Sequence, residues 1–578
     1  MENTVTPTKS AKTKRYSLKK RLPTAILCAL APAVTLFTGI FELYAGNREE
    51  LEFAFTDVLM GVLLICLALA AVFLAILLPL RGKAFRVASA VVAWLSLMFF
   101  LQGTFLNVGV NSLAADGVGM KVHPAWEIGN AVLWLATLCG VLWLVLRLKK
   151  KEAREWLKLG VRIVLILVIG AQMIPFAITS FTTDVFAPKS GLAGGRHILT
   201  EEGMFEVSSE DNILIFVLDS FDADYVKDVT AEDPDFFQPL DGFTYYQDNL
   251  SWYTRTFPAA ASMITGVKND FTTDAATYFD KAYGSSSFLD DLKQNNYRIN
   301  LFIDDYYAYR DAATLEGFVE NVSVVEGGYT VENKGKLMLH LVGVATYRYM
   351  PIPVKRVFDL STESFKGFVK YNGAEYPAYV SDDAVYFDRL EENGLTAVDG
   401  QNQYMFIHME GCHTPYRLDE FGNPTALGTA ESTTKGCMRM IYAYMEELKR
   451  LGLYEDATIV ITGDHPGRFK DYENVPHPTL TALFFKPKGS AGTPLAYSQS
   501  PVAQDMLIPS LVASAGMVTE HPYGDTYWDA SMEKRSYYFL KNTGTTDYRV
   551  VEYEVLGDGR AFENWEIISE TDIGFLYE

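Results

Sequence analysis

The chain has 578 residues, of which 49% are hydrophobic, and a formal net charge of −21. It is therefore long enough for more than one domain and too acidic to bind nucleic acid by neutralising phosphates. The charge is divided sharply, because residues 1–180 hold 19 basic and 10 acidic side chains whereas the remainder holds 31 and 61. This division predicts two parts that occupy different environments.

Five apolar stretches follow a basic tail over residues 1–22, and each is about long enough to span a bilayer. They run over Pro23–Leu43, Thr56–Leu80, Val87–Val108, Trp126–Leu146 and Leu159–Phe181. The first stretch is too long, and followed by too many others, to be a simple signal peptide. We expect a five-helix transmembrane bundle over residues 23–181; five buried core helices of a globular protein are the alternative.

The segments between these stretches alternate in charge. The tail and the loops over residues 81–86 and 147–158 are basic, whereas loops 47–52 and 111–123 are not. Because basic loops stay in the cytoplasm, we expect a multi-pass protein of the cell membrane with a cytoplasmic N terminus and an extracellular part after residue 181. The spans hold few charges, with Glu42 and Asp57 close to their ends, so no ion pathway of a transporter is evident.

Short apolar runs alternate with amphipathic stretches after a linker over residues 182–210. Strands are expected at Asn212–Leu218, Phe243–Gln247, Arg298–Asp304, Tyr404–His408, Thr458–Thr462 and Leu480–Lys486. Helices are expected at Ala259–Ile264, Ser287–Asn295, Asp382–Glu392, Thr434–Leu451 and Pro501–Ser514. The alternation predicts an α/β domain over residues 211–578, with a mostly parallel sheet and helices on both faces. Its end, from about residue 530 to 578, is expected to form a small antiparallel sheet because Gly turns separate short strand-like runs.

Two of the expected strands end in side chains that bind metal ions. Asp219 follows the first strand, and Asp464 and His465 follow Thr458–Thr462 after Gly463. Open α/β sheets bind ligands at the carboxyl ends of their strands, and Asp with His suits Zn²⁺ or Mn²⁺. Each residue alone also fits a helix cap or a loop.

Thr256 directly precedes the expected helix Ala259–Ile264, and Pro258 suits the first turn of that helix. Free backbone N–H groups and the positive end of the helix dipole favour phosphate binding at this place. An ordinary N-cap threonine would occupy the same position.

Other histidines and cysteines carry weaker signals. His413 and His477 lie beside this scaffold, and each fits a loop histidine equally well. His340 lies in a helical stretch and is expected to be structural. Cys412 and Cys437 could form a disulfide outside the cell, although their spacing does not show it.

Four segments together resemble the sulfatase-like branch of the alkaline phosphatase superfamily. They read NILIFVLDS, TFPAAASMITG, HMEGCHTPY and ITGDHP, and they occur in the family's order over roughly residues 211–520. The second segment is similar to the arylsulfatase signature, yet Thr256 stands where arylsulfatases have the Cys or Ser that becomes formylglycine. Ala260 stands where they carry Arg. These two departures speak against sulfate-ester hydrolysis.

A threonine nucleophile with five N-terminal spans resembles lipoteichoic acid synthases and phosphoethanolamine transferases. The resemblance implies one divalent metal, with Mn²⁺ foremost and Zn²⁺ or Mg²⁺ as alternatives, held by Asp219, Thr256, Asp464 and His465. It implies substrate-phosphate roles for His413 and His477, and Arg255 is a further candidate for binding the head group. These transferases usually carry Glu where this chain has Asp219.

The reaction that the resemblance implies moves a phospho-alcohol head group, phosphoglycerol or phosphoethanolamine, from a phospholipid donor to a glycan or glycolipid acceptor of the cell envelope. A metal ion would activate the threonine hydroxyl, which is a poor nucleophile on its own, and phospho-Thr256 would be the intermediate. One alternative is a membrane-anchored sulfatase or phosphodiesterase that uses water with the same site. A second alternative is an inactive ectodomain that binds envelope polymers.

Overall fold

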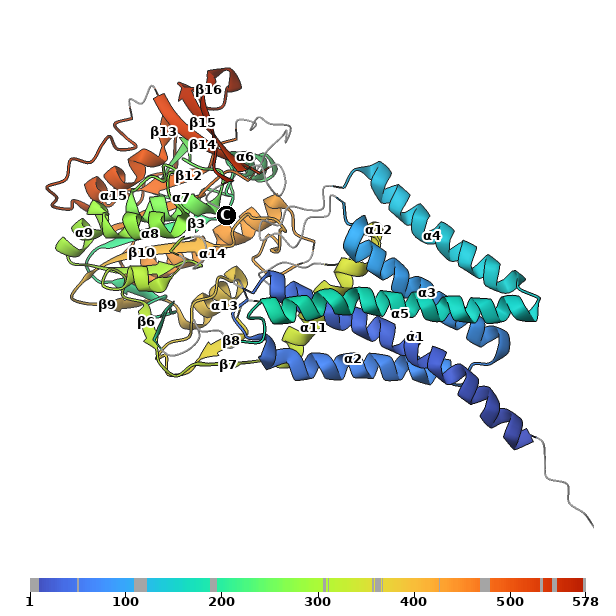
Figure 1. The fold of residues 1–578 in the computed structure, drawn as a ribbon. Coiled ribbons are helices and arrows are strands. Elements are labelled where there is room, and N and C mark those ends of the chain that lie inside the picture. The colour runs from blue at the N-terminus through green and yellow to red at the C-terminus, as the bar shows by residue number, and fades with distance from the viewer. Residues whose placement is uncertain are drawn as a thin grey trace, which may run out of the picture. The chain divides into compact units, whose positions relative to one another are not determined.

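The computed structural model describes residues 10–48, 51–108, 122–187, 195–304, 308–309, 311–355, 358, 365, 367–425, 427–467, 479–530, 534–542 and 548–574, with the backbone alone for residues 10–17 and 542. Contacts along the chain divide it into two compact units (Figure 1). The membrane unit consists of Met1–Leu192 and Tyr329–Lys370. The α/β unit consists of Ala193–Gly328 and Tyr371–Glu578.

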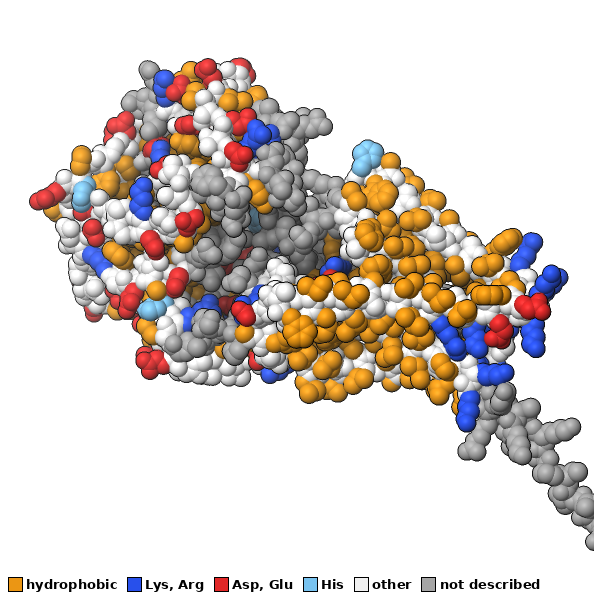
Figure 2. All heavy atoms as spheres, in the orientation of Figure 1, with side chains coloured by type: hydrophobic (Ala, Val, Ile, Leu, Met, Phe, Trp, Pro, Cys, Tyr) orange, Lys and Arg blue, Asp and Glu red, His pale blue; other side chains and the backbone are white. Residues whose placement is uncertain are grey.

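Five long helices make up the first part of the membrane unit. They are α1 (Ser10–Gly46), α2 (Phe55–Leu77), α3 (Gly82–Leu101), α4 (Pro124–Arg147) and α5 (Lys151–Thr182), and the short π-helix η1 (Gln102–Leu106) extends α3. Each helix has an 18-residue window whose mean hydropathy is 1.9 or higher. Apolar side chains cover the sides of these helices (Figure 2), and Phe181 is 91% exposed. The prediction of five helices long and apolar enough to cross a membrane is therefore confirmed.

The membrane unit also contains a later part of the chain. The described residues of this part form the short strand β7 (Tyr329–Val331), the helices α11 (Lys334–Tyr349) and α12 (Ile352–Lys355), and the start of strand β8 (Val369–Tyr371). From the sequence this segment was expected to lie in the exported domain, which was placed at residues 211–578. Its contacts group it with the apolar helices instead.

A seven-stranded sheet lies at the centre of the α/β unit, with the strand order β13-β4-β12-β11-β3-β10-β5. The strands are β3 (Asn212–Leu218), β4 (Thr244–Leu250), β5 (Tyr297–Phe302), β10 (Asn402–Met409), β11 (Ala457–Thr462), β12 (Leu483–Lys486) and β13 (Ala496–Ala503). The central group β11, β3, β10 and β5 pairs in parallel, and β12 runs antiparallel to both of its neighbours. The predicted mostly parallel sheet is confirmed.

Helices cover both faces of this sheet, as predicted. One face packs against α7 (Thr256–Thr265), α8 (Ala275–Gly284), α9 (Ser287–Gln294) and α15 (Leu507–Ala515). The other face packs against α6 (Ala223–Glu232), α13 (Asp383–Asn393) and α14 (Ala430–Leu451). Because β3 is buried on both faces, it reads as a continuous apolar run rather than an alternating one.

Smaller sheets complete the α/β unit. The predicted C-terminal antiparallel sheet is present as β14 (Lys534–Asn542), β15 (Tyr548–Leu556) and β16 (Trp565–Asp572). Two-stranded pairs join β1 (Arg196–Leu199) to β6 (Val322–Val325) and β2 (Glu206–Ser208) to β9 (Thr396–Val398). Cys412 and Cys437 are buried and free, so the disulfide that their location allowed is not formed.

The helix predicted over Pro501–Ser514 is wrong in its first part. Pro501 lies in β13, just after a shift in the register of that strand against β4, and α15 begins only at Leu507. As an edge strand, β13 accommodates a residue without an N–H group at no loss of a ladder hydrogen bond.

Candidate active site

Three neighbouring parallel strands bring polar side chains to one edge of the sheet. In the pairing of β3 with β11, Val217 lies opposite Thr462, so the residues just beyond them, Asp219 and Asp464, leave the sheet side by side. In the pairing of β3 with β10, Val217 lies opposite His408. This is the carboxyl edge of the parallel strands, where the sequence predicted a ligand site.

Alternation along the strands directs these side chains to the same face. On β10, Tyr404 and Phe406 pack into the core under α7, whereas Met405 and Ile407 pack into the core on the opposite side. His408 has the same parity as Tyr404 and Phe406, so its imidazole lies on the α7 face. The site is thus formed between the sheet edge and the start of α7.

Thr256 is the first residue of α7 and is 8% exposed. Its hydroxyl donates to Asp219 Oδ2 at 3.2 Å and lies 3.4 Å from His465 Nε2. The neighbouring Phe257 has non-helical φ and ψ, so the regular helix continues from Pro258. A hydroxyl is thereby held among a carboxylate and an imidazole at the start of a helix.

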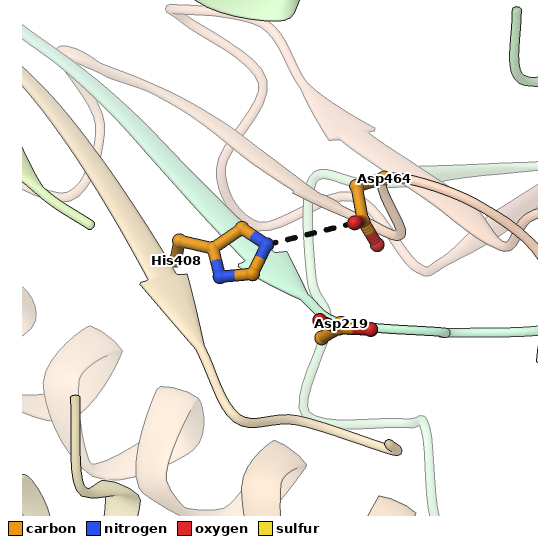
Figure 3. A group of neighbouring side chains, drawn as sticks. All are labelled: Asp219, His408 and Asp464. Carbon is orange, nitrogen blue, oxygen red and sulfur yellow. Dashed lines mark ion pairs between the residues drawn. The ribbon is translucent and has the colours of Figure 1, made fainter. Parts of the chain in front are cut away.

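Asp464 lies close to two imidazoles. His408 Nε2 and His465 Nε2 each lie 3.6 Å from Asp464 Oδ2, and His465 Nε2 is also 3.6 Å from Asp219 Oδ1. Figure 3 shows His408 beside Asp464 and Asp219. Asp219, His408 and Asp464 can each offer one ligand atom, all within 4.8 Å of one another. The distances suit a shared cation better than direct hydrogen bonds, which need about 3 Å.

The backbone fixes both the aspartate and the histidine of the ITGDHP segment. Asp464 Oδ1 accepts from the backbone N–H of Ser220 at 3.1 Å, and Ser220 adopts a left-handed φ of 60° at the turn after β3. His465 Nδ1 lies 3.0 Å from the carbonyl of Pro466. A proton on Nδ1 would donate to that carbonyl, which leaves the Nε2 lone pair directed at Asp219 and Asp464.

Charge in the site follows from these contacts. Burial alone would raise the pKa of Asp464, but the nearby His465 and His408 and the Ser220 N–H hold it well below its usual range. Burial alone would lower the pKa of His408, but Asp464, Asp219 and Asp304 together raise it. Asp464 is therefore ionised at neutral pH and attracts a cation.

Two buried polar atoms indicate that a metal ion would fit this site. His408 Nε2 and Asp464 Oδ2 have no hydrogen-bond partner among the residues that the structure describes. A buried polar atom without a partner costs free energy, and a divalent cation between the two would satisfy both. Mixed oxygen and nitrogen donors suit Zn²⁺ or Mn²⁺, as expected from the sequence.

The predicted site residues are placed as follows. Asp219, Thr256, Asp464 and His465 come together. Arg255 is half-buried directly before Thr256, and His413 is half-buried in the loop after β10. His477 lies outside the described residues.

His408 is a site residue that the sequence does not predict, because it reads as the last residue of the expected strand Tyr404–His408. The available signal was a histidine within the fully apolar run YMFIHM of β10, where a buried imidazole needs a partner. His340, expected to be structural, packs in the membrane unit against Phe365 and Phe368.

The loop after β10 packs against the backbone of Asp219. Gly411 has a φ of 62°, and a Cβ on it would lie 2.4 Å from the backbone nitrogen of Asp219. The buried Asp383 carboxylate accepts from the N–H groups of Glu410 and Gly411, both at 2.9 Å. The loop is therefore fixed by its own backbone against the turn that carries Asp219.

No family model and no curated protein matches this chain. Among solved structures, it is similar to lipoteichoic acid synthase LtaP from Listeria monocytogenes, with 13% identity, a TM-score of 0.33 and coverage of 63% of this chain and 85% of that one. A protein in the alkaline phosphatase superfamily from Vibrio parahaemolyticus is 12% identical with a TM-score of 0.36, covering 65% and 84%. Phosphonate monoester hydrolase SpPMH from Silicibacter pomeroyi is 12% identical with a TM-score of 0.34, covering 63% and 89%. The function proposed below rests on the geometry of the site.

Proposed function

We propose that this chain is a membrane-anchored, metal-dependent transferase that moves a phospho-alcohol head group from a phospholipid to a glycan or glycolipid of the cell envelope. The observation that carries the proposal is the position of Thr256 Oγ1, 3.2 Å from Asp219 Oδ2 and 3.4 Å from His465 Nε2. A hydroxyl held among charged and basic groups is the arrangement that covalent catalysis needs. Five apolar helices in the same chain support a lipid donor, because they keep the enzyme in the bilayer that contains it.

The transfer proceeds in two steps. Thr256 Oγ attacks the lipid phosphorus, its proton passes to a base, the Oγ–P bond forms and the bond from phosphorus to the diacylglycerol oxygen breaks. The leaving diacylglycerol oxygen takes up a proton. An acceptor hydroxyl then attacks phospho-Thr256, so the bond from the acceptor oxygen to phosphorus forms and the Oγ–P bond breaks. The acceptor hydroxyl gives up its proton, and Thr256 Oγ takes up a proton as it leaves. The head group is phosphoglycerol or phosphoethanolamine.

Residues of this chain fill each role. Asp219 Oδ2 accepts the hydrogen bond of Thr256 and lies within reach of its proton. His413, in the loop after β10, is the candidate donor to the leaving oxygen, and Arg255 and His477 are candidates for the head group. Asp219, Thr256, Asp464 and His465, joined by His408, would hold the metal. The bound metal, Mn²⁺ foremost, would favour the ionised hydroxyl and offset charge on the phosphoryl oxygens.

The experiment is intact-protein mass spectrometry of the full-length chain in detergent. The full chain is needed because Tyr329–Lys370 belongs to the membrane unit, so residues 182–578 alone would lack the partner of that segment. The protein is incubated with Mn²⁺ and, in separate samples, phosphatidylglycerol or phosphatidylethanolamine. We expect a mass increase that maps to Thr256, and its size names the head group.

Two variants control this experiment. Thr256→Ser keeps a hydroxyl and should still form the adduct. Thr256→Ala should form none while the protein stays folded, because Thr256 makes no capping hydrogen bond in α7 and the lost hydrogen bond to Asp219 costs only about 1 kcal/mol. Steady release of free head group without an acceptor would establish the hydrolase alternative. Neither adduct nor release from the metal-loaded protein would overturn the proposal.

A further inference from the structure

Residues Tyr329–Lys370, here called the docking segment, leave the α/β unit and return to it at one place. Strands β7 and β8 at its two ends pair with each other. Next to them, Glu332 N–H donates to the Phe368 carbonyl at 2.8 Å and Asn372 N–H to the Gly328 carbonyl at 2.9 Å. The segment is thus a closed excursion of the exported part of the chain, and its helices pack in the membrane unit.

The polar side chains of the apolar helices bind this segment. Glu42 pairs with Arg348 at 2.7 Å, and Asp57 Oδ2 accepts from Tyr329 Oη at 2.6 Å. Asn107 Nδ2 donates to the Arg348 carbonyl at 3.0 Å. These contacts explain the two acidic residues of the spans that the sequence left without a role.

A buried amide network extends the same contact. Asn130 Oδ1 accepts from the backbone N–H of Ile352 at 3.0 Å, and Asn130 Nδ2 donates to Gln102 Oε1 at 2.9 Å. Trp134 Nε1 donates to the same Gln102 oxygen at 2.9 Å, and Gln102 Nε2 donates to Asn107 at 2.8 Å. Polar groups within apolar spans are costly unless they are paired. Here the pairing ends on the backbone of the docking segment.

Packing is as close as the hydrogen bonding. Tyr349 is 8% exposed, and its ring lies between α1 and η1. A Cβ at Gly39 would lie 2.7 Å from this ring, and a Cβ at Gly103 would lie 2.6 Å from it. These two glycines therefore leave the space that the tyrosine occupies, while Leu337 and Leu341 of α11 are fully buried.

All these contacts lie at one end of the helices. Glu42 is near the end of α1, Gln102 and Asn107 are at the end of α3 and η1, and Asp57 and Asn130 are near the beginnings of α2 and α4. Alternating chain direction places these ends together, and the charge of the loops predicts that this end faces outside. The exported part of the chain is expected on that side.

We propose that the outer end of the helices is a receptor for the docking segment, and that this contact holds the exported catalytic part to the membrane independently of the covalent linker. The partner is chemically defined. Helix α11 presents the Arg348 cation to Glu42 and the Arg348 carbonyl to Asn107, and its Tyr349 occupies the space beside Gly39 and Gly103. Helix α12 presents the Ile352 N–H to Asn130. Cutting the linker after α5 then leaves the catalytic part attached. The proposal does not depend on the reaction that the site performs.

The test uses the full-length chain with an affinity tag at its N terminus and a protease recognition sequence inserted between Ala187 and Gly195. The protein is captured from mild detergent through its tag and cut, and the C-terminal fragment is measured in the bound and flow-through fractions. We expect most of the wild-type fragment to stay bound. Because micelles replace the bilayer, retention reports contact with the tagged helices rather than with lipid.

Charge reversal supplies the controls. Arg348→Glu should release most of the fragment after cutting, and the double exchange Glu42→Arg with Arg348→Glu should restore retention, which excludes simple misfolding. Lys370→Glu is the matched control, because Lys370 pairs with Glu332 of the same segment at 3.9 Å. Release of the wild-type fragment on cutting would overturn the proposal, and so would equal retention of the Arg348→Glu fragment.

Discussion

The hydroxyl of Thr256 donates a hydrogen bond to Asp219 Oδ2 at 3.2 Å across a separation of 37 residues. The fold brings them together because Asp219 directly follows the central strand β3, while Thr256 begins the helix that covers that face of the sheet. A carboxylate in this position can receive the proton of the hydroxyl when the hydroxyl acts as a nucleophile.

Asp219→Asn therefore tests catalysis with little change of shape. The amide keeps an oxygen for the Thr256 hydroxyl but loses the negative charge that takes a proton and binds a cation. We expect the rate of adduct formation at Thr256 to fall by about 10²–10⁴-fold, the range typical of a lost acid–base group. The measurement is the time course of the mass increase, with circular dichroism to show an unchanged fold. An unchanged rate would remove Asp219 from the mechanism.

Metal binding should depend on Asp464. Its carboxylate is buried, ionised and short of a partner at Oδ2, so Asp464→Asn should lose most of the bound metal as measured by elemental analysis after dialysis. In the wild type, free Mn²⁺ at 100 times its dissociation constant should stabilise the fold by about 2.7 kcal/mol, and chelation should reverse this. Equal metal content in the two proteins would contradict a ligand role for Asp464.

His408 should contribute to the metal affinity of the same site. Its Nε2 lies 3.6 Å from Asp464 Oδ2 and has no hydrogen-bond partner among the described residues. We expect His408→Asn to weaken metal affinity by about 10–100-fold, which is the range for losing a group that contacts a metal ligand. His521→Asn is the control, because His521 contacts Asp291 instead, with Nδ1 to Oδ2 at 3.0 Å. Equal affinities in a metal titration of the two variants would exclude His408 from the site.

Gly411 should be needed for the position of Asp219. Gly411→Ala places a methyl group 2.4 Å from the Asp219 backbone nitrogen, so the turn after β3 must move. Gly452→Ala is a matched control: Gly452 also has a positive φ, of 74°, but a Cβ there meets no atom within 4 Å. The positive φ should cost each variant about 1–2 kcal/mol of stability, and Gly411→Ala should lose more because its methyl group meets backbone atoms. Only Gly411→Ala should also lose activity, and equal activity would refute the positioning role.

Local sequence was enough to predict the elements whose burial is uniform. The run NILIFVL is buried along its whole length and forms β3 over the predicted residues, and the five spans are predicted by length and hydropathy. The Asp-His pair of ITGDHP was likewise predicted at a strand end, because a Gly turn after an apolar strand is a local signal.

Features that depend on distant partners were not predicted. A histidine within the buried run of β10 indicates that its imidazole needs a partner, but the partner, Asp464, follows another strand and cannot be identified from the local sequence. The position of α11 and α12 depends on Glu42, Asn107 and Asn130, which lie more than 200 residues earlier in the chain, so the local sequence of these helices predicts only that they belong to the exported part. Residues 501–503 form part of a strand where the sequence favours a helix, because the edge position that tolerates Pro501 is a property of the sheet.

The Asp383 carboxyl group should make the stability of the folded state depend on pH. Burial raises the pKa of its carboxyl group to about 6, although the N–H groups of Gly411 and Glu410 oppose the shift. Between the ordinary value of 3.8 and about 6, the folded state keeps a proton that the unfolded state has lost. Stability from this group is therefore full at low pH and is lost as the pH rises through that window, by about 3 kcal/mol in all.

The measurement is hydrogen exchange of peptides that cover Asp383 and the loop at Glu410 and Gly411, in the full-length protein from about pH 4 to pH 7, corrected for the intrinsic pH dependence of exchange. In Asp383→Asn the side-chain amide does not titrate. The part of the pH dependence of local stability that comes from Asp383 should therefore disappear, while the part that comes from other titrating groups remains. The difference between wild type and variant isolates Asp383 from metal loss at low pH. If local stability depends on pH in the same way in both proteins, the Asp383 carboxyl group is already ionised at the acid end of the range. The two N–H groups would then lower its pKa more than burial raises it.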